Sequence, residues 1–205
     1  MRLYLASTSP ARLATLRSAG IEPVTHSPLV DEDGVVAAAG ELSAHDMVAL
    51  LARTKAEAVV ALHGEDIDGL VLGGDSAFVI DGIIHGKPHD SAVAKARWLS
   101  QTGRSGVLYS GHWLIDHRDG KVNGGVGIVT HAEVQFADVT ENEIDAYIAT
   151  GEPLAVAGAF TIDSLGGAFI DRIVGDPHTV VGLSLPALRN LVRSFGIEWT
   201  DLWNR

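Results

Sequence analysis

Residues 2–12 read RLYLASTSPAR and change from a strand pattern to a helix pattern through small hydroxyl residues. The segment Arg2–Ala6 predicts a short strand that enters the core. Ser9 and Pro10 then predict a helix start, because serine is a favoured N-cap and proline fits the first helical turn. Gly20 marks the end of that helix.

Strand and helix patterns alternate along the rest of the chain, but hairpins interrupt the alternation. Asp81-Gly82 is a strong hairpin-turn signal, and Thr140 with Glu143 forms a capping box. We therefore expect an α/β or α+β protein with a central mixed β-sheet flanked by helices. After the first strand and helix, the expected strands are Ile21–Leu29, Leu70–Leu72, Ala77–Ile80, Ile83–His85, Gly106–Asp116, Val122–Phe136 and Ala168–Val174. The expected helices are 43–62, Ser91–Ser100, a short helix that begins after Thr140, and Leu185–Phe195. We expect Val30–Glu41 to be a loop.

Composition narrows the functional classes. The chain has 205 residues, 46% hydrophobic content and no cysteine, so disulfides and thiolate metal sites are excluded. No apolar run is long enough to span a bilayer, so we expect a cytoplasmic protein without a membrane partner. The net charge of −11 disfavours a broad nucleic-acid footprint but still allows a few basic residues to hold one phosphorylated ligand.

The first helix offers a candidate anion site at its N-terminus. Unpaired N–H groups and the helix dipole favour anions there, close to Ser7 and Ser9. Arg12 can add a forked donor set for phosphate. The segment alone favours an ordinary capped helix with a solvated arginine, because Ser-Pro caps are common.

Other polar residues are candidates for chemistry, although each also has an ordinary structural interpretation. Asp75 follows two glycines at the expected end of a buried strand, where it could bind Mg²⁺ or orient water, or simply form a turn. Lys87, between glycine and proline, could place a charge on a phosphate or lie in an exposed turn. Lys55 lies in a predicted helix where lysines are commonly solvated, and the acidic run Asp31–Asp33 could hold metal or form a charged loop.

Taken together and in order, these segments resemble the Maf family of nucleotide pyrophosphatases, also described as septum-formation inhibitors. The resemblance covers nearly the whole chain. It rests on the ordered motifs LASTSPAR, VDED, LARTKAEAV, LGGD, HGKP, LSQTG, VTENEIDAYIATGEP, AGAF, GDPHTVVGLSL and RSFG.

The resemblance implies a fold of the Maf/ITPase type, with residues 1–205 as a single domain of two lobes around an active-site cleft, often as a homodimer. It implies hydrolysis of ordinary or noncanonical nucleoside triphosphates to the monophosphate and pyrophosphate, dependent on Mg²⁺ or Mn²⁺. By motif, Asp75 would accept the proton of water, and Glu32 would hold metal together with Asp75. The residues implied to hold the phosphates are Arg12, Lys55 and Lys87, with Ser7 and Ser9 nearby.

The chain departs from the family motifs at several positions. Ala11 replaces an arginine, and Asp75 is followed by Ser76 rather than threonine. Asp163 aligns with a glutamine that is common in one branch. Ser76 and Asp163 are therefore candidates for contacts with the base. The base preference stays open between the thymidine/uridine branch and the 7-methylguanosine branch.

Two further classes compete with the enzyme. One is a non-catalytic regulator of cell division that binds a nucleotide or a protein, and the other is a nucleic-acid-binding module. The presence of Asp75, Glu32, Lys55 and Lys87 favours the enzyme, because a pure binder does not need a water-activating carboxylate.

Overall fold

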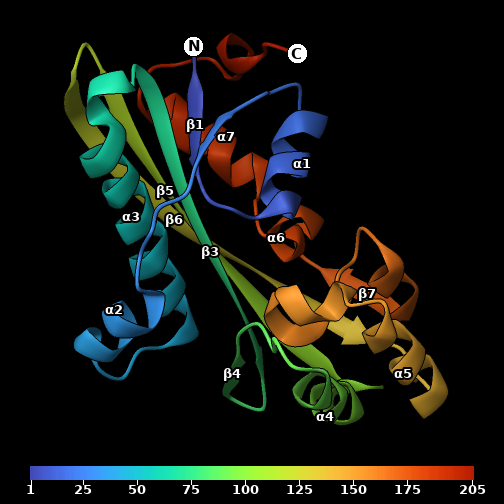
Figure 1. Ribbon diagram of the computed structural model, residues 1–205. Helices are drawn as coiled ribbons and strands as arrows, with labels where there is room; N and C mark the ends of the chain where they lie inside the picture. Colours follow the sequence, from blue (N-terminus) through green and yellow to red (C-terminus); the bar gives the residue numbers. More distant parts are fainter. The chain divides into compact units, whose positions relative to one another are not determined.

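The computed structural model describes residues 1–205, and their strands form one mixed sheet (Figure 1). The strands are β1 (Leu3–Ala6), β2 (Val24–His26), β3 (Gly69–Ile80), β4 (Ile83–His85), β5 (Ser105–Arg118), β6 (Lys121–Phe136) and β7 (Ile170–Val174). Their order is β2-β1-β3-β5-β6-β7, with β4 paired to β3. β1 is parallel to β2 and β3, whereas the pairs β3–β4 and β6–β7 are antiparallel. The predicted mixed sheet with flanking helices is confirmed.

The chain divides into two compact units. Unit 1 comprises Met1–Asp75, Ser110–Thr130 and Gly182–Arg205, and unit 2 comprises Ser76–Tyr109 and His131–Val181. The long strands β3, β5 and β6 contribute residues to both. The expected single domain with two lobes around a cleft stays a prediction.

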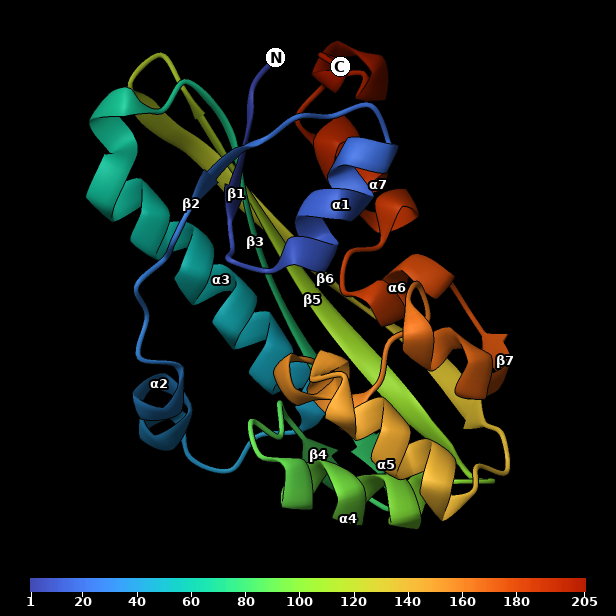
Figure 2. The same cartoon turned by 45° about the vertical axis from the view of Figure 1, so that its right-hand side comes forward.

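In unit 1, helices cover both faces of the sheet. The helices are α1 (Pro10–Ser18), α2 (Glu32–Ala39), α3 (Ala44–His63) and α7 (Leu185–Ser194), with short 3₁₀ helices η1 (Gly64–Asp66) and η5 (Trp199–Leu202). α3 lies on one face, and α1 and α7 lie on the other (Figure 2). Strand alternation explains this: Leu70 and Leu72 pack with α1 and α7, whereas Val71 packs with Ala56 and Val59 of α3.

Unit 2 is built around an aromatic core. Its helices are α4 (Ser91–Gln101), α5 (Glu141–Ala149) and α6 (Pro177–Val181), with 3₁₀ helices η2 (Glu152–Ala155), η3 (Ala157–Ala159) and η4 (Leu165–Phe169). Phe78, Trp98, Phe136 and Phe160 meet edge to face. The Trp98 indole Nε1 also donates a hydrogen bond to the Ala159 carbonyl at 2.8 Å, which ties α4 to η3.

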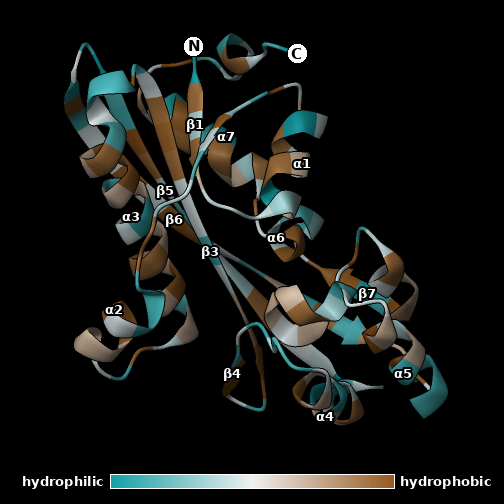
Figure 3. Ribbon diagram, viewed as in Figure 1, coloured by the Kyte–Doolittle hydropathy of each residue, from teal (hydrophilic) through white to brown (hydrophobic).

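Helix starts and hairpin turns follow the sequence. Ser9 caps α1, Ser43 caps α3, and the Thr140 capping box opens α5. Asp81 and Gly82 both have positive φ, as a tight hairpin turn requires. In Figure 3, hydrophilic and hydrophobic segments alternate along α3, which packs one side on the sheet. No helix combines the length and the apolar character that a bilayer crossing requires.

The expectation of a loop at Val30–Glu41 is wrong. This segment contains α2, which Asp31 caps by accepting a hydrogen bond from the Gly34 N–H at 3.0 Å. None of the residues of α2 is buried. The helix therefore lacks a buried apolar stripe, which is the periodic signal by which a helix is recognised in a sequence.

The expected strand end at the Gly73-Gly74-Asp75 sequence is also wrong. β3 continues from Gly69 to Ile80, so Asp75 lies within a strand and not beyond its end. The two glycines have no positive φ and do not form a turn. Smaller differences are a β2 that is shorter than expected, a β7 that begins only at Ile170, and the short helix α6, which was not expected.

Candidate active site

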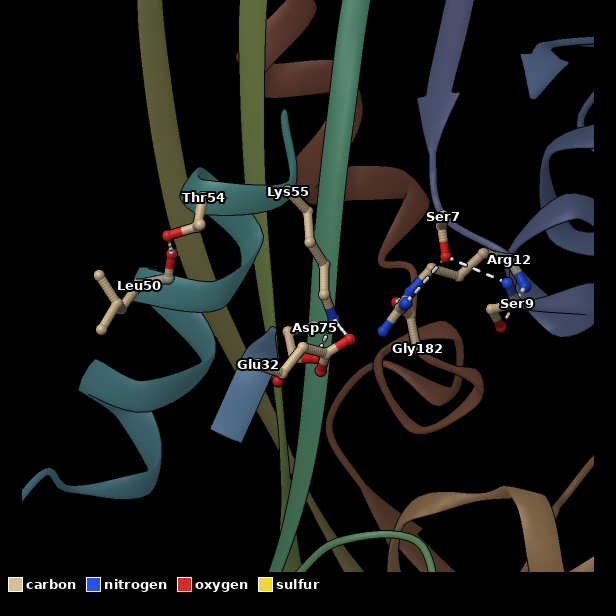
Figure 4. A network of polar contacts seen from close by, with 9 residues as sticks. All are labelled: Ser7, Ser9, Arg12, Glu32, Leu50, Thr54, Lys55, Asp75 and Gly182. Carbon is tan, nitrogen blue, oxygen red and sulfur yellow. Dashed lines mark hydrogen bonds and ion pairs between the residues drawn. The ribbon is translucent and has the colours of Figure 1, made fainter. Parts of the chain in front are cut away.

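The N-terminus of α1 and the loop before it form a polar cluster in which Ser7 and Arg12 are buried. Ser9 Oγ accepts from the backbone N–H of Arg12 at 3.4 Å, and Ser7 Oγ accepts from the backbone N–H of Ser9 at 3.1 Å. The Arg12 side chain donates from Nη1 to Ser7 Oγ at 3.2 Å and from Nε to the Gly182 carbonyl at 2.9 Å. Its guanidinium points toward Asp75 (Figure 4). The arginine is thus an oriented group within the unit and not a solvated surface cation.

A second cluster joins α2, α3 and β3. Lys55 Nζ lies 2.7 Å from Asp75 Oδ1 and 2.9 Å from Glu32 Oε1. The side chains of Lys55 and Asp75 are 8% and 11% exposed, whereas that of Glu32 is 49% exposed. One ammonium group therefore lies between a buried and a half-exposed carboxylate, at the centre of the view in Figure 4.

Gly73 and Gly74 explain how these groups come so close together. A Cβ at Gly73 would lie 2.1 Å from the Ala52 carbonyl oxygen, so α3 can approach β3 only because this position has no side chain. A Cβ at Gly74 would lie 3.1 Å from Arg12 Nε, on the other face of the strand. The glycines admit α3 on one side and the guanidinium on the other, immediately before Asp75.

The electrostatic environment of Asp75 combines burial with neighbouring cations. Burial raises the pKa of Asp75, and the charges of Lys55 and Arg12 act in the opposite direction. Burial likewise lowers the pKa of Arg12, opposed by Asp75 and Glu32, but an arginine remains cationic in proteins. A carboxylate whose burial increases its basicity, held beside cations, has the properties of a positioned proton acceptor.

The sequence of this chain matches a known protein family over nearly its whole length. The sequence profile described as "Maf-like protein" matches residues 2–195. This chain belongs to the Maf-like family. The chain is 68% identical over 210 residues to the nucleoside triphosphate pyrophosphatase of Leifsonia xyli subsp. xyli, covering 100% of this chain and 98% of the relative. It is 48% identical to the protein of the same name from Rhodococcus jostii, covering 97% and 94% of the two chains.

Among solved structures, the chain is similar to a nucleoside-triphosphatase / dITP/XTP pyrophosphatase from Mycobacterium abscessus. The TM-score is 0.42 at 15% sequence identity, covering 95% of each chain.

The structure brings together six of the residues that the Maf-like motifs single out. They are Ser7, Ser9, Arg12, Glu32, Lys55 and Asp75, and all belong to unit 1. Sequence reasoning did not identify Gly182, whose carbonyl anchors the Arg12 guanidinium. No motif could reveal it, because a backbone oxygen makes the contact and any residue type supplies one.

The remaining candidates, Lys87, Ser76 and Asp163, belong to unit 2. Lys87 is exposed in the loop between β4 and α4, and Asp163 is exposed in the bend that precedes η4. Ser76 directly follows Asp75 in β3, so the two side chains leave the strand on opposite faces. The roles of these three residues stay predictions.

The bend around Asp163 is held by Glu152, a residue that sequence reasoning passed over. The Glu152 carboxylate accepts from the hydroxyls of Tyr147, Thr161 and Ser164 at 2.5–2.9 Å. It also accepts the backbone N–H groups of Leu165 and Gly166 at 3.2 and 3.0 Å. Burial opposes the ionisation of Glu152, but hydrogen bonds from Thr161, Gly166 and Ser164 outweigh it and lower the pKa to about 2. A fixed negative charge therefore anchors this loop on both sides of Asp163.

The fit of a divalent metal depends on Asp75 and Glu32. Their carboxylates approach one common point, the Lys55 Nζ atom, at 2.7 and 2.9 Å. No cluster of three or more acidic, histidine or cysteine side chains that could hold a metal is present. Mg²⁺ is commonly bound by one or two carboxylates, with substrate phosphates and water completing its shell. The donor set of unit 1 fits an ion of that kind but does not form a complete protein cage.

Proposed function

We propose that this chain is an enzyme that hydrolyses nucleoside triphosphates, including deoxy and modified or noncanonical ones, to the monophosphate and pyrophosphate. The observation that carries the proposal is the arrangement of buried Arg12 and Lys55 around the buried carboxylate of Asp75. The names of the relatives, among them one at 68% identity, support the same activity. The proposed reaction is the hydrolysis of an acid anhydride, the bond between the α- and β-phosphates.

The first task of the site is to hold a triphosphate. A nucleoside triphosphate brings about four negative charges, which require several cations to stabilise them. Arg12 offers a planar donor fork whose Nε and Nη1 are fixed by Gly182 and Ser7. Ser7 and Ser9 lie at the N-terminus of α1, where the helix dipole favours anions.

The second task is to activate water. We assign Asp75 as the proton acceptor, with Lys55 fixing its Oδ1 atom. As a water oxygen attacks the α-phosphorus, its proton passes to the Asp75 carboxylate, and the bond from the α-phosphorus to the bridging oxygen breaks. The electron pair of that bond leaves with pyrophosphate, whose developing charge Arg12 and Lys55 stabilise.

We further propose that Asp75 and Glu32 hold Mg²⁺ or Mn²⁺ when the substrate binds. The ion would neutralise phosphate charge and polarise the phosphoryl oxygens. Its binding would require Lys55 to release at least one of its two carboxylate partners. Glu32 is the more exposed partner, so its contact is the easier one to exchange.

The alternative of a non-catalytic regulator gains no support from the relatives' names or from this arrangement. A binder of nucleotides needs cations but has no use for a buried proton acceptor between them. We place the activity in the cytoplasm because its substrates are soluble nucleotides. The homodimer and the absence of a nucleic-acid partner remain part of the proposal.

The nature of the products tests the proposed function directly. A panel of ordinary and modified nucleoside triphosphates is incubated with enzyme and Mg²⁺ or Mn²⁺, and both phosphate products are quantified. We expect monophosphate and pyrophosphate in equal amounts, and no turnover after chelation of the metal. Diphosphate and orthophosphate as the main products would reject attack at the α-phosphorus.

A further prediction separates binding of the phosphates from recognition of the base. All substrates share the phosphates, so Lys87→Ala should lower kcat/KM for every accepted nucleotide by a similar factor. The loss of one charge-assisted contact corresponds to about 1.5–3 kcal/mol of transition-state stabilisation. Asp163→Gln should instead change the ranking of the bases, because ionised aspartate only accepts hydrogen bonds whereas glutamine also donates. The measurement is kcat/KM across the panel for both variants. The reverse pattern, in which Lys87→Ala reorders the bases, would show that the two roles are interchanged.

A further inference from the structure

His112 is a buried polar side chain in the unit-1 part of β5 that the proposed chemistry does not use. It is 2% exposed. Its Nε2 atom accepts a hydrogen bond from the backbone N–H of Ser184 at 2.9 Å. Because a backbone N–H can only donate, Nε2 must carry a lone pair in this contact. The ring therefore acts toward Ser184 as an acceptor.

The Ser184 contact fixes a short segment that also holds Arg12. Ser184 is the N-cap of α7, and its Oγ accepts from the backbone N–H of Ala187 at 3.2 Å. Two residues earlier, the Gly182 carbonyl accepts from Arg12 Nε at 2.9 Å in a buried contact. Gly182 has a φ of 107°, a conformation that side-chain-bearing residues rarely adopt. The segment Gly182–Ser184 is thus held at one end by His112 and at the other by Arg12.

We propose that His112 is a positioning residue that orients Arg12 for phosphate through the segment Gly182–Ser184. The proposal rests on the proposed function, in which Arg12 binds the phosphates. A planar donor fork binds phosphate well only when its plane and distance are set in advance. Loss of the His112 acceptor would leave the Ser184 N–H buried without its partner, which favours a shift of the segment and of the Gly182 carbonyl.

A matched pair of variants isolates the acceptor from the bulk of the side chain. His112→Gln offers an amide oxygen to the Ser184 N–H, whereas His112→Met is of similar length and offers only a weak thioether acceptor. The probe is inorganic pyrophosphate, titrated by calorimetry against each variant in the wild-type and Arg12→Met backgrounds. Thermal unfolding and the separate KM and kcat values for one accepted triphosphate complete the set.

We expect His112→Met to weaken pyrophosphate binding about tenfold, the scale of one net hydrogen bond, and His112→Gln to restore most of it. kcat/KM should fall by a similar factor or more, because Arg12 both binds the triphosphate in the ground state and stabilises the pyrophosphate that develops in the transition state. In the Arg12→Met background, His112→Met should have no further effect, because both changes act through the same group.

Several outcomes would overturn the proposal. One is equal weakening by both His112 variants, and another is weakening that persists without Arg12. A third is a lower melting temperature of the His112 variants with unchanged pyrophosphate affinity, which would make His112 purely structural. A fourth is that the wild-type protein does not bind pyrophosphate. If the expected binding pattern is found but no triphosphate is cleaved, the proposed function fails and the positioning role stands.

Discussion

Asp75→Asn is expected to lower kcat by at least about a hundredfold, the scale of a positioned proton acceptor. The change is nearly isosteric and removes the group that we assign to take the proton from water. It also removes one of the two carboxylates proposed to hold metal. The measurement is steady-state pyrophosphate release from the best substrate of the panel, at saturating substrate and metal.

Asp171→Asn is the matched control for this substitution. Asp171 lies in β7 of unit 2 and is exposed. The same loss of a carboxylate there should leave kcat within about twofold, as for surface changes away from a site. Retained activity in Asp75→Asn, with a cooperative thermal transition, would return Asp75 to a structural role.

Lys55→Met is expected to destabilise the folded chain by about 3–5 kcal/mol, the cost of removing one partner from a buried ion pair. The variant leaves the Asp75 carboxylate buried without the ammonium group at 2.7 Å. The loss should shrink as pH falls. Without Lys55 the folded-state pKa of Asp75 lies further above its unfolded value, so protonation at low pH relieves the penalty. Urea unfolding at neutral and acidic pH measures both effects.

Two controls show whether the Lys55 effect arises from the pair. Lys121→Met changes an exposed lysine of β6 and should alter stability by less than about 0.5 kcal/mol. Adding Asp75→Asn to Lys55→Met should recover part of the lost stability, since the unpaired charge is then gone. A double variant as unstable as the sum of the single ones would mean that the two groups do not stabilise each other.

The parts of the fold that the sequence predicted are those set by local rules. Ser9, Ser43 and Thr140 cap helices because their hydroxyls accept the first backbone N–H groups, and this needs no knowledge of the rest of the chain. The turn at Asp81-Gly82 follows from the positive φ that its residues tolerate. Caps and turns of this kind are encoded within a few residues.

The parts that the sequence did not predict depend on contacts across the chain. Gly73 and Gly74 looked like the end of a strand, because glycine pairs more often mark turns than close packing. Glycine is required at these two positions because α3 and Arg12 approach the strand there, and this approach exists only in the folded state. The burial of Lys55 also depends on a contact across the chain. The helix pattern alone predicts a solvated lysine, but in the fold β3 places Asp75 within hydrogen-bond distance of it.

The motif resemblance supplied what local rules could not, since it named Glu32, Lys55 and Asp75 together. The structure places all three within one ion-pair cluster. It leaves the contributions of Lys87 and Asp163 as predictions. The role of His112 had no sequence signal, because its importance lies in a backbone N–H seventy-two positions away.

The anchoring of the Asp163 loop by Glu152 has a consequence for engineering substrate choice. The side-chain hydroxyls of Thr161 and Ser164 donate to the Glu152 carboxylate, so changing either residue would remove an anchor of the loop. At Gly166 the anchor is the backbone N–H, but a side chain there would crowd the Tyr147 hydroxyl. Asp163 lies between these anchors with an exposed side chain. We propose that Asp163 contacts the base; a directed-evolution library that randomises Asp163 and keeps the anchors would then vary this contact on a constant backbone, with little loss of folded variants.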